Sequence, residues 1–214
     1  MAYKVVPTIT AKDEVDYRRQ IDNVRNYAEA LHIDLMDGKF APSISPPLEH
    51  TWWPHELKAY IHLMFENPMD YLDQLIRLKP HMVIIHNEVT VHHMHFAAEL
   101  HKHGIEAGLA ILQETPIEWA YQIMHSFDQM LVFSGKLGYH GGTADLGLLD
   151  KVKKIKQHHP EAEIAWDGGI NDQNALALVE GGVNVLNVGG YIQDSSEPKA
   201  AYDKIEMELK NKNA

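Results

Sequence analysis

The sequence predicts an α/β protein built as one closed (β/α)8 barrel, and three observations lead to this fold class. Short β-branched or apolar runs alternate with longer segments of helical periodicity along the 214 residues. Eight such pairs can be distinguished, whereas an open doubly wound sheet usually has five or six strands. The chain length falls at the small end of the range for eight-unit barrels.

Several of the predicted strands are apolar on both faces, which is typical of parallel strands whose outer face is covered by helices. In chain order we expect strands at Lys4–Ile9, His32–Met36, Tyr60–Met64, Met82–His86, Glu106–Ile111, Gln129–Phe133, Glu163–Trp166 and Val185–Val188.

The segments between these strands carry apolar residues at the i, i+3, i+4 spacing of helices. Pro68, Pro116 and Pro198 stand near expected helix starts, where a missing N–H costs nothing. Gly104 and Gly181 follow expected helices as C-caps. The predicted helical segments are Val15–Leu31, a short piece at Glu49–Leu57, Pro68–Leu78, Val91–His103, Pro116–Met124, Leu146–His158, Asn171–Gly181 and Pro198–Leu209.

Composition favours a single domain over residues 1–214 and limits the classes of function. The absence of cysteine excludes a disulfide scaffold, a thiolate metal site and a cysteine nucleophile. A formal net charge of −11 argues against nucleic acid or an anionic membrane as a partner. No apolar run approaches the roughly 18 residues of a membrane span, and the first ten residues lack the apolar core of a secretion signal. We therefore expect a cytoplasmic protein.

Polar residues cluster at the expected carboxyl ends of the strands, where barrels of this kind carry their active sites. His32 and Asp34 are two residues apart and therefore point to the same face of their strand. His62 and Asp167 occupy the ends of the third and seventh strands. Two imidazoles and two carboxylates would suit Zn²⁺, with Fe²⁺, Mn²⁺ or Co²⁺ also possible in principle. The alternative is four separate buried polar residues, each satisfied by a neighbour.

Two glycine pairs, Gly168-Gly169 and Gly189-Gly190, end the last two strands. Phosphate sites in such barrels are built after strands 7 and 8, where glycine lets backbone N–H groups approach a ligand closely. Ordinary turn chemistry is the alternative explanation. The histidine-rich stretches have a simpler interpretation as outer-surface residues: His92, His93, His95, His101, His103, His158 and His159.

These segments together resemble the ribulose-phosphate 3-epimerase family. His32–Pro42 resembles the strand-2 signature of the family, Ile61–Met64 its strand-3 signature, Trp166–Asn171 its strand-7 motif and Pro7–Ile9 its opening Pro-Ser-Ile. The similarity runs from about residue 6 to residue 205, nearly the whole chain.

The resemblance implies a TIM barrel of the ribulose-phosphate-binding type. It further implies metal-dependent interconversion of D-ribulose 5-phosphate and D-xylulose 5-phosphate, a step of the pentose phosphate pathway, by two-base proton transfer at C3 through an enediolate. The metal ligands would be His32, Asp34, His62 and Asp167, with Asp34 and Asp167 as the acid/base pair. The implied partners are a phosphorylated ketose and further copies of the chain in a homo-oligomer. The implied substrate contacts are Thr8, Met36, His62, Met64, Gly138, Tyr139, His140, Gly141, Gly168, Gly169, Gly189 and Gly190.

The sequence also departs from the family pattern. The sixth loop usually reads Pro-Gly-Phe-Gly-Gly-Gln, but here it is Leu137–Gly142, with His140 in place of a glycine. Phe133 takes a position usually held by methionine, and Gly190 that of a serine. The segment from His32 to His62 is also shorter than usual. Two other functions therefore stay open: epimerisation of another ketose phosphate such as D-allulose 6-phosphate, and phosphosugar binding without turnover. A decarboxylase or aldolase would need a strand-end lysine, and none is evident.

Overall fold

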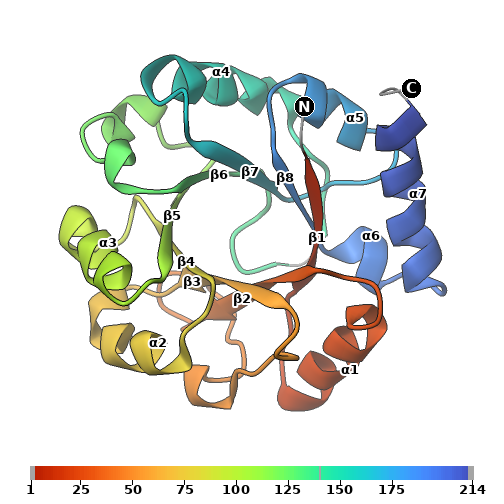
Figure 1. Ribbon diagram of the computed structural model, residues 1–214, viewed down its shortest axis with the longest axis horizontal. Helices are drawn as coiled ribbons and strands as arrows, with labels where there is room; N and C mark the ends of the chain where they lie inside the picture. The colour runs from red at the N-terminus through yellow and green to blue at the C-terminus, as the bar shows by residue number, and fades with distance from the viewer. Residues whose placement is uncertain (1–2, 140, 212–214) are drawn as a thin grey trace.

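A computed structural model describes residues 3–139 and 141–211, and its strands form a closed parallel barrel (Figure 1). Each strand pairs with the next along the chain, and the last pairs with the first. The predicted fold class is therefore confirmed. The strands are β1 (Lys4–Ile9), β2 (Ala30–Met36), β3 (Lys58–Met64), β4 (Met82–His86), β5 (Glu106–Ile111), β6 (Gln129–Phe133), β7 (Glu163–Asp167) and β8 (Val185–Val188).

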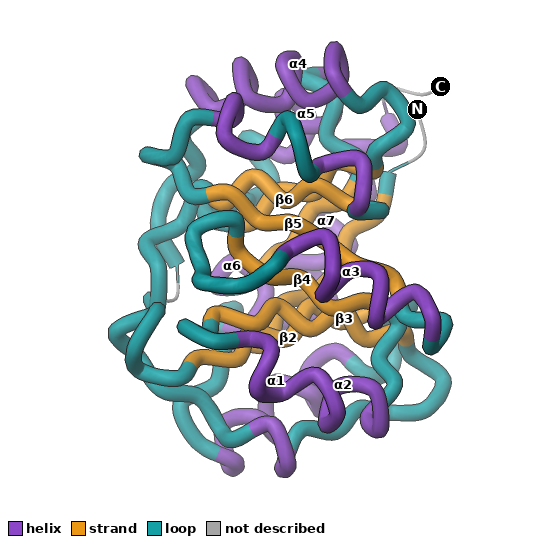
Figure 2. The backbone as a smooth tube through the Cα atoms, turned by 90° about the vertical axis from the view of Figure 1, so that its left-hand side faces the viewer, coloured by secondary structure: helices purple, strands orange, loops and turns teal. Residues whose placement is uncertain are grey.

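The α-helices surround the barrel (Figure 1), and the loops crowd the end of the barrel opposite the two chain termini (Figure 2). Most predicted helices are confirmed with shorter bounds. The α-helices are α1 (Glu14–Val24), α2 (Leu72–Leu78), α3 (His93–Lys102), α4 (Leu149–His158), α5 (Ala175–Glu180), α6 (Gly190–Gln193) and α7 (Pro198–Asn211), with 3₁₀ turns at Pro68–Tyr71 and Leu146–Leu148 leading into α2 and α4.

Two predicted helical segments hold only 3₁₀ turns. The short piece expected at Glu49–Leu57 is reduced to one turn, Leu48–His50, because Pro47 precedes it and Pro54 follows it, and neither can donate a backbone hydrogen bond. The helix predicted at Pro116–Met124 is wrong, since that segment holds the 3₁₀ turns Ile117–Ala120 and Met124–Ser126. The connections after β2 and β5 therefore carry 3₁₀ turns in place of an α-helix.

The structure also differs from prediction at the first helix and after β8. The first helix ends at Val24 rather than residue 31, because β2 begins at Ala30 and pairs there with Lys58 of β3. Gly181 is the C-cap of α5, as predicted, and the glycine with a positive φ is the next residue, Gly182, at +105°. The four-residue helix α6, which directly follows β8, was not expected, since four residues carry no periodicity.

Side chains alternate between the barrel interior and the helix-facing side. The barrel interior nearer the amino ends of the strands is apolar and includes Val6, Tyr60, Met82, Ala165 and Val185. A separate, larger apolar cluster fills the space between strands and helices. Because the strand period is two, residues at even steps from these interior positions also face inward, nearer the carboxyl ends. That alternation carries polar side chains to the barrel mouth.

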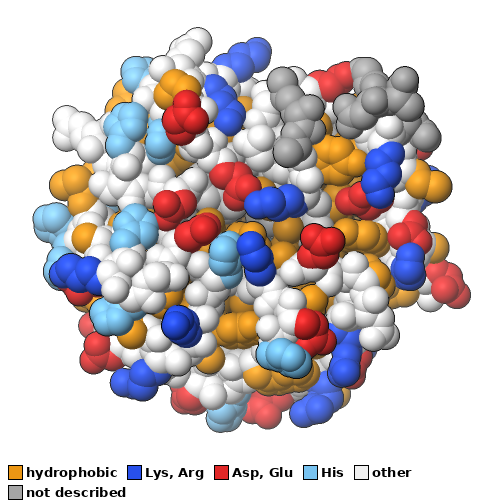
Figure 3. Space-filling view, viewed as in Figure 1, with side chains coloured by type: hydrophobic (Ala, Val, Ile, Leu, Met, Phe, Trp, Pro, Cys, Tyr) orange, Lys and Arg blue, Asp and Glu red, His pale blue; other side chains and the backbone are white. Residues whose placement is uncertain are grey.

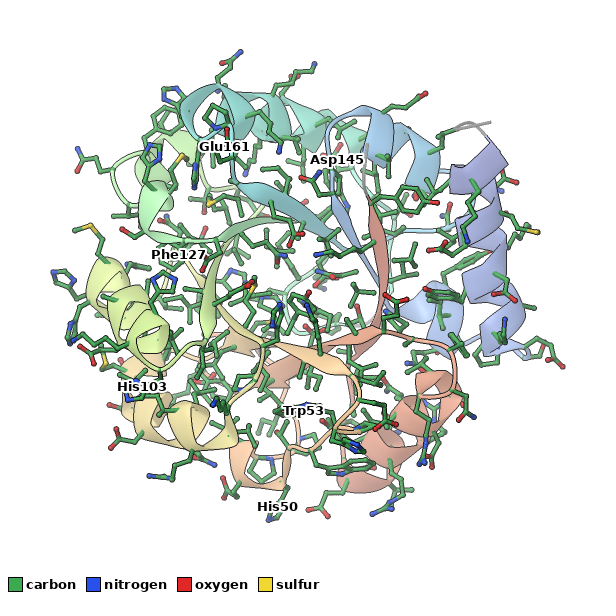
Figure 4. All side chains as sticks on the ribbon, in the orientation of Figure 1. His50, Trp53, His103, Phe127, Asp145 and Glu161 are labelled. Carbon is green, nitrogen blue, oxygen red and sulfur yellow. The ribbon has the colours of Figure 1, made fainter. Side chains whose placement is uncertain are left out.

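Most histidines outside the barrel lie on the surface, as expected. Figure 3 shows them gathered on the left of one face, and Figure 4 shows His50 and His103 projecting outward at the rim. His93 is an exception to the prediction, because its Nε2 lies 3.0 Å from the backbone oxygen of His86. Within the described ranges, no helix combines the length and apolarity needed to cross a membrane.

We predict that Trp166→Ala destabilises the fold by about 3–5 kcal/mol, because it leaves a large cavity between barrel and helices. Trp166 is fully buried, and its indole Nε1 donates to the backbone oxygen of Gly168 at 3.1 Å. Urea unfolding followed by circular dichroism measures the change. Trp119→Ala is the matched control, because Trp119 is 68% exposed and should change the free energy of unfolding by less than about 0.5 kcal/mol. Equal effects of the two variants would contradict this account of the core.

Candidate active site

Four buried polar side chains meet inside the mouth of the barrel. His32 and Asp34 come from β2, His62 from β3 and Asp167 from the last position of β7. Each offers one ligand atom, and the four atoms lie within 4.8 Å of one another. Both histidines are completely buried, and each aspartate is 7% exposed. The fold therefore brings these four residues together, as the sequence predicted.

The spacing of the four ligand atoms fits a small divalent cation. His32 Nε2 lies 3.3 Å from His62 Nδ1, 3.2 Å from Asp34 Oδ1 and 3.4 Å from Asp167 Oδ2. His62 Nδ1 lies 3.0 Å from Asp34 Oδ1 and 3.7 Å from Asp167 Oδ2. Ligands about 2.1 Å from a tetrahedral zinc ion are separated by about 3.4 Å. The donor types and their separations therefore both suit such an ion.

The electrostatics of the cluster favour a positive charge at its centre. Burial alone would lower the pKa of His32, but hydrogen bonds and charge from Asp167 and Asp34 raise it to about 9. Burial would raise the pKa of Asp34, but the hydrogen bonds from His32 and His62 hold it well below its usual range. In the bare chain a proton on His32 thus balances part of the carboxylate charge, and a divalent cation can displace that proton.

A second layer of polar side chains lies behind His62. Its Nε2 is 2.8 Å from His86 Nε2, and His86 Nδ1 is 3.4 Å from Glu88 Oε2. The backbone N–H of Leu112 donates to the other Glu88 oxygen at 3.1 Å. Burial lowers the pKa of His86 to about 4, so this imidazole is neutral. Sequence reasoning noted the strand-end position of His86 but gave it no role.

A cavity of about 280 Å³ opens directly above the four residues. This volume is at the small end for ligand sites, which suits a small molecule. Asp34 and Asp167 line it, whereas His32 and His62 lie beneath. His140 lies outside the described residues, and the predicted substrate contact of His62 stays a prediction. The predicted contact residues that line the cavity are Thr8, Met36, Met64, Gly138, Tyr139, Gly141, Gly168, Gly169, Gly189 and Gly190.

Glycines form the end of the cavity next to β7 and β8. Gly168 and Gly169 have φ angles of +110° and +71°, in the region that favours glycine. A Cβ on Gly169 would overlap the backbone nitrogen of Ala144, so the loops after β6 and β7 can pack together only with glycine there. No lysine or arginine is among the described residues that line the cavity. An anion at this end would therefore depend on backbone N–H groups.

The loop after β6 folds against the loop after β2. The Ser43 hydroxyl donates to the backbone oxygen of Gly138, and a Cβ on Gly138 would press on Pro42. Tyr139 is 53% exposed, and the Lys136 ammonium lies 4.3 Å from the centre of its ring. The altered sixth loop thus forms part of the cavity wall.

Sequence reasoning missed Thr10, which lines the cavity and donates a hydrogen bond from Oγ1 to Asp34 Oδ2 at 2.7 Å. The alternation of β1 was the available signal, because Thr10 follows Thr8 by two residues and so points the same way. Phe133 also lines the cavity, at the position where the resemblance suggested methionine. Its aromatic ring completes an apolar wall with Met36 and Met64.

The fold and the site together define a barrel enzyme. At the carboxyl ends of its strands it carries two paired carboxylates and two imidazoles, a set of ligands of the kind that binds divalent cations. The sequence model of the ribulose-phosphate 3 epimerase family matches residues 4–193. The ribulose-phosphate 3-epimerase of Helicobacter pylori is 31% identical over 212 residues, covering 95% of this chain and 96% of the relative. That of Bacillus subtilis is 29% identical over 212 residues, covering 94% and 97%. The chain therefore belongs to the ribulose-phosphate 3-epimerase family, as its motifs predicted, and it is an epimerase.

Solved structures with low sequence identity share the fold. The KGPDC from Streptococcus mutans superposes with a TM-score of 0.74 at 12% identity, covering 98% of each chain. The 3-hexulose-6-phosphate synthase from Salmonella typhimurium gives a TM-score of 0.71 at 14% identity, covering 97% of this chain and 99% of that one. These similarities support the barrel architecture alone. The predicted homo-oligomer and cytoplasmic location stay predictions.

We predict that Gly169→Ala lowers the free energy of unfolding by about 2–4 kcal/mol. The alanine would have to adopt a left-handed backbone conformation, and its Cβ would also clash with the loop after β6. Gly104→Ala is the matched control. Gly104 has a nearly identical φ of +72°, but a Cβ there meets nothing within 4 Å. The control should lose only about 1–2 kcal/mol in urea unfolding. A Gly169→Ala variant as stable as the control would show that the two loops are not tightly packed.

Proposed function

We propose that this chain is a metal-dependent 3-epimerase that interconverts D-ribulose 5-phosphate and D-xylulose 5-phosphate. The observation that carries the proposal is the meeting of two carboxylates and two imidazoles within 4.8 Å in the cavity floor of a chain that belongs to this family. Inversion of a carbon beside a carbonyl requires removal of a proton from one face and its return to the other. Asp34 and Asp167 come from separate strands, β2 and β7, and both line the cavity. They are the two groups that we assign to that transfer.

His32 Nε2, His62 Nδ1, Asp34 Oδ1 and Asp167 Oδ2 would hold the cation, with zinc as the first candidate for this donor set. When bound, a divalent ion supplies Lewis-acid stabilisation of the negative charge that develops on the substrate oxygens during proton removal. His62 must present a lone pair at Nδ1 for this purpose, so its proton sits on Nε2 and points at His86 Nε2. Neutral His86 then carries its own proton on Nδ1, facing Glu88.

The remainder of the cavity binds and orients the sugar phosphate. Gly169, Gly189 and Gly190 line the cavity next to the ends of β7 and β8, and their backbone N–H groups are the anion donors in the proposal. Phosphate held there fixes C3 between the two aspartates, so that binding energy serves positioning. The apolar wall of Met36, Met64 and Phe133 keeps water from the flat enediolate.

We predict that Asp34→Asn and Asp167→Asn each lower the epimerisation rate by at least about 1000-fold while the fold is retained, because each removes one of the two proton carriers. Exchange of the C3 hydrogen in deuterated water, followed by NMR, measures the chemical step directly. Asp150→Asn on α4 is the control, because that carboxylate is exposed and pairs only with Lys153 among the interactions described. Full activity in either active-site variant would refute the two-base assignment, and a wild-type chain that exchanged no C3 hydrogen of D-ribulose 5-phosphate would contradict the proposed substrate.

We also predict that the purified protein binds one divalent ion per chain and loses activity when a chelator removes it. Zinc should restore the activity. Calorimetric titration of the metal-free protein should show His32→Ala binding zinc at least about 100-fold more weakly than wild type, because one of four ligands is lost. His95→Ala, which changes an exposed histidine on α3, should bind zinc at this site like wild type. Undiminished binding in His32→Ala would place the ion elsewhere.

A further inference from the structure

Thr10 makes a direct contact with one of the two aspartates that the proposed function uses. It follows β1 by one residue and points into the barrel mouth, where its side chain lines the cavity. Its hydroxyl donates to Asp34 Oδ2 at 2.7 Å. A short hydrogen bond of this kind to a carboxylate is stronger than one between neutral groups.

The two oxygens of Asp34 have different partners. Oδ1 faces the histidines, at 3.2 Å from His32 Nε2 and 3.0 Å from His62 Nδ1. Oδ2 faces Thr10. The carboxylate is therefore held at both ends, and its plane cannot turn about the Cβ–Cγ bond without losing one set of contacts. Asp167 Oδ2 lies farther from the same histidines, at 3.4 Å from His32 Nε2 and 3.7 Å from His62 Nδ1.

Thr10 is itself held in place from outside the barrel. The buried side-chain amide of Gln20, on α1, accepts from the Thr10 backbone N–H at 2.9 Å and donates to the Thr10 backbone oxygen at 3.2 Å. Gln193 of α6 donates to the backbone oxygens of both Gln20 and Thr8, at 3.3 and 3.2 Å. Two helices thus fix the backbone on which the Thr10 hydroxyl is mounted.

We propose that Thr10 is a positioning residue for Asp34. Its hydroxyl turns the carboxylate so that Oδ1 belongs to the cation-binding cluster and Oδ2 is presented to the cavity, where the proton of C3 is exchanged. This inference rests on the proposed function for its catalytic consequence, whereas the orientation of Oδ1 also acts on metal binding. Misplacing a catalytic group by about 1 Å can cost about 100-fold in rate, which sets the scale of the effect.

Thr10→Val removes the hydroxyl with almost no change of shape, and Thr10→Ser retains it. With metal at saturation, Thr10→Val should lower kcat about 10–100-fold and C3 hydrogen exchange to the same degree, with KM within about threefold of wild type. The metal-free Thr10→Val protein should bind zinc about tenfold more weakly in calorimetric titration. Thr10→Ser should stay within about threefold of wild type in all these quantities.

Thr51→Val is the matched control, because Thr51 is also buried, its hydroxyl has no partner among the described residues, and it does not line the cavity. It should leave kcat and zinc affinity unchanged. The positioning role is overturned if Thr10→Val keeps the wild-type kcat and zinc affinity, if Thr10→Ser is as impaired as Thr10→Val, or if only KM rises, which would indicate a direct substrate contact. An inactive wild-type chain would overturn the proposed function instead, and the zinc titration would then still decide the role of Thr10.

Discussion

Two carboxylates buried side by side are the constraint on which the rest of the site depends. Asp34 and Asp167 are almost without contact to water, and two like charges in such a place are unfavourable unless positive charge lies between them. In the bare chain His32 supplies that charge by keeping a proton, with a pKa of about 9. A divalent cation at the same place would supply it more completely, with the imidazole as a ligand. The requirement for positive charge between the two carboxylates is thus one that either a proton on His32 or a bound cation can meet.

The closed barrel makes this arrangement rigid. The apolar side chains of the barrel interior lie beneath the four polar residues and exclude water from that side. The strand register places Asp34 directly beside His62 on the neighbouring strand. Behind these residues, polar side chains reach in from two sides. His86 and Glu88 lie behind His62, and Thr10, held by Gln20, lies beside Asp34. Sites built on strands and held by such outer contacts keep the small tolerances that proton transfer requires.

An acidic chain can still hold an anionic sugar in this cavity. The formal net charge is −11, and no lysine or arginine is among the described lining residues. In the proposed function local fields decide the matter, since backbone N–H groups at Gly169 and Gly190 would act over a few ångströms. Distant surface carboxylates act through water and salt, which screen them beyond about 10 Å. Attraction of the anion therefore does not need a basic patch.

The sequence by itself determined the order of the strands and the bounds of most of them, because parallel strands covered on both faces are continuous apolar runs that stand out locally. It also determined His32, Asp34, His62 and Asp167 as a group, since inward positions at strand ends follow from a period of two. The tertiary structure alone decided which neighbours these groups meet. Thr10 and Gln20 become partners only when α1 packs on the barrel, and His86 meets His62 only through the pairing of β3 with β4. The short turn at residues 117–120 was likewise settled by packing, because a segment that brief carries too little periodicity for propensity to fix it.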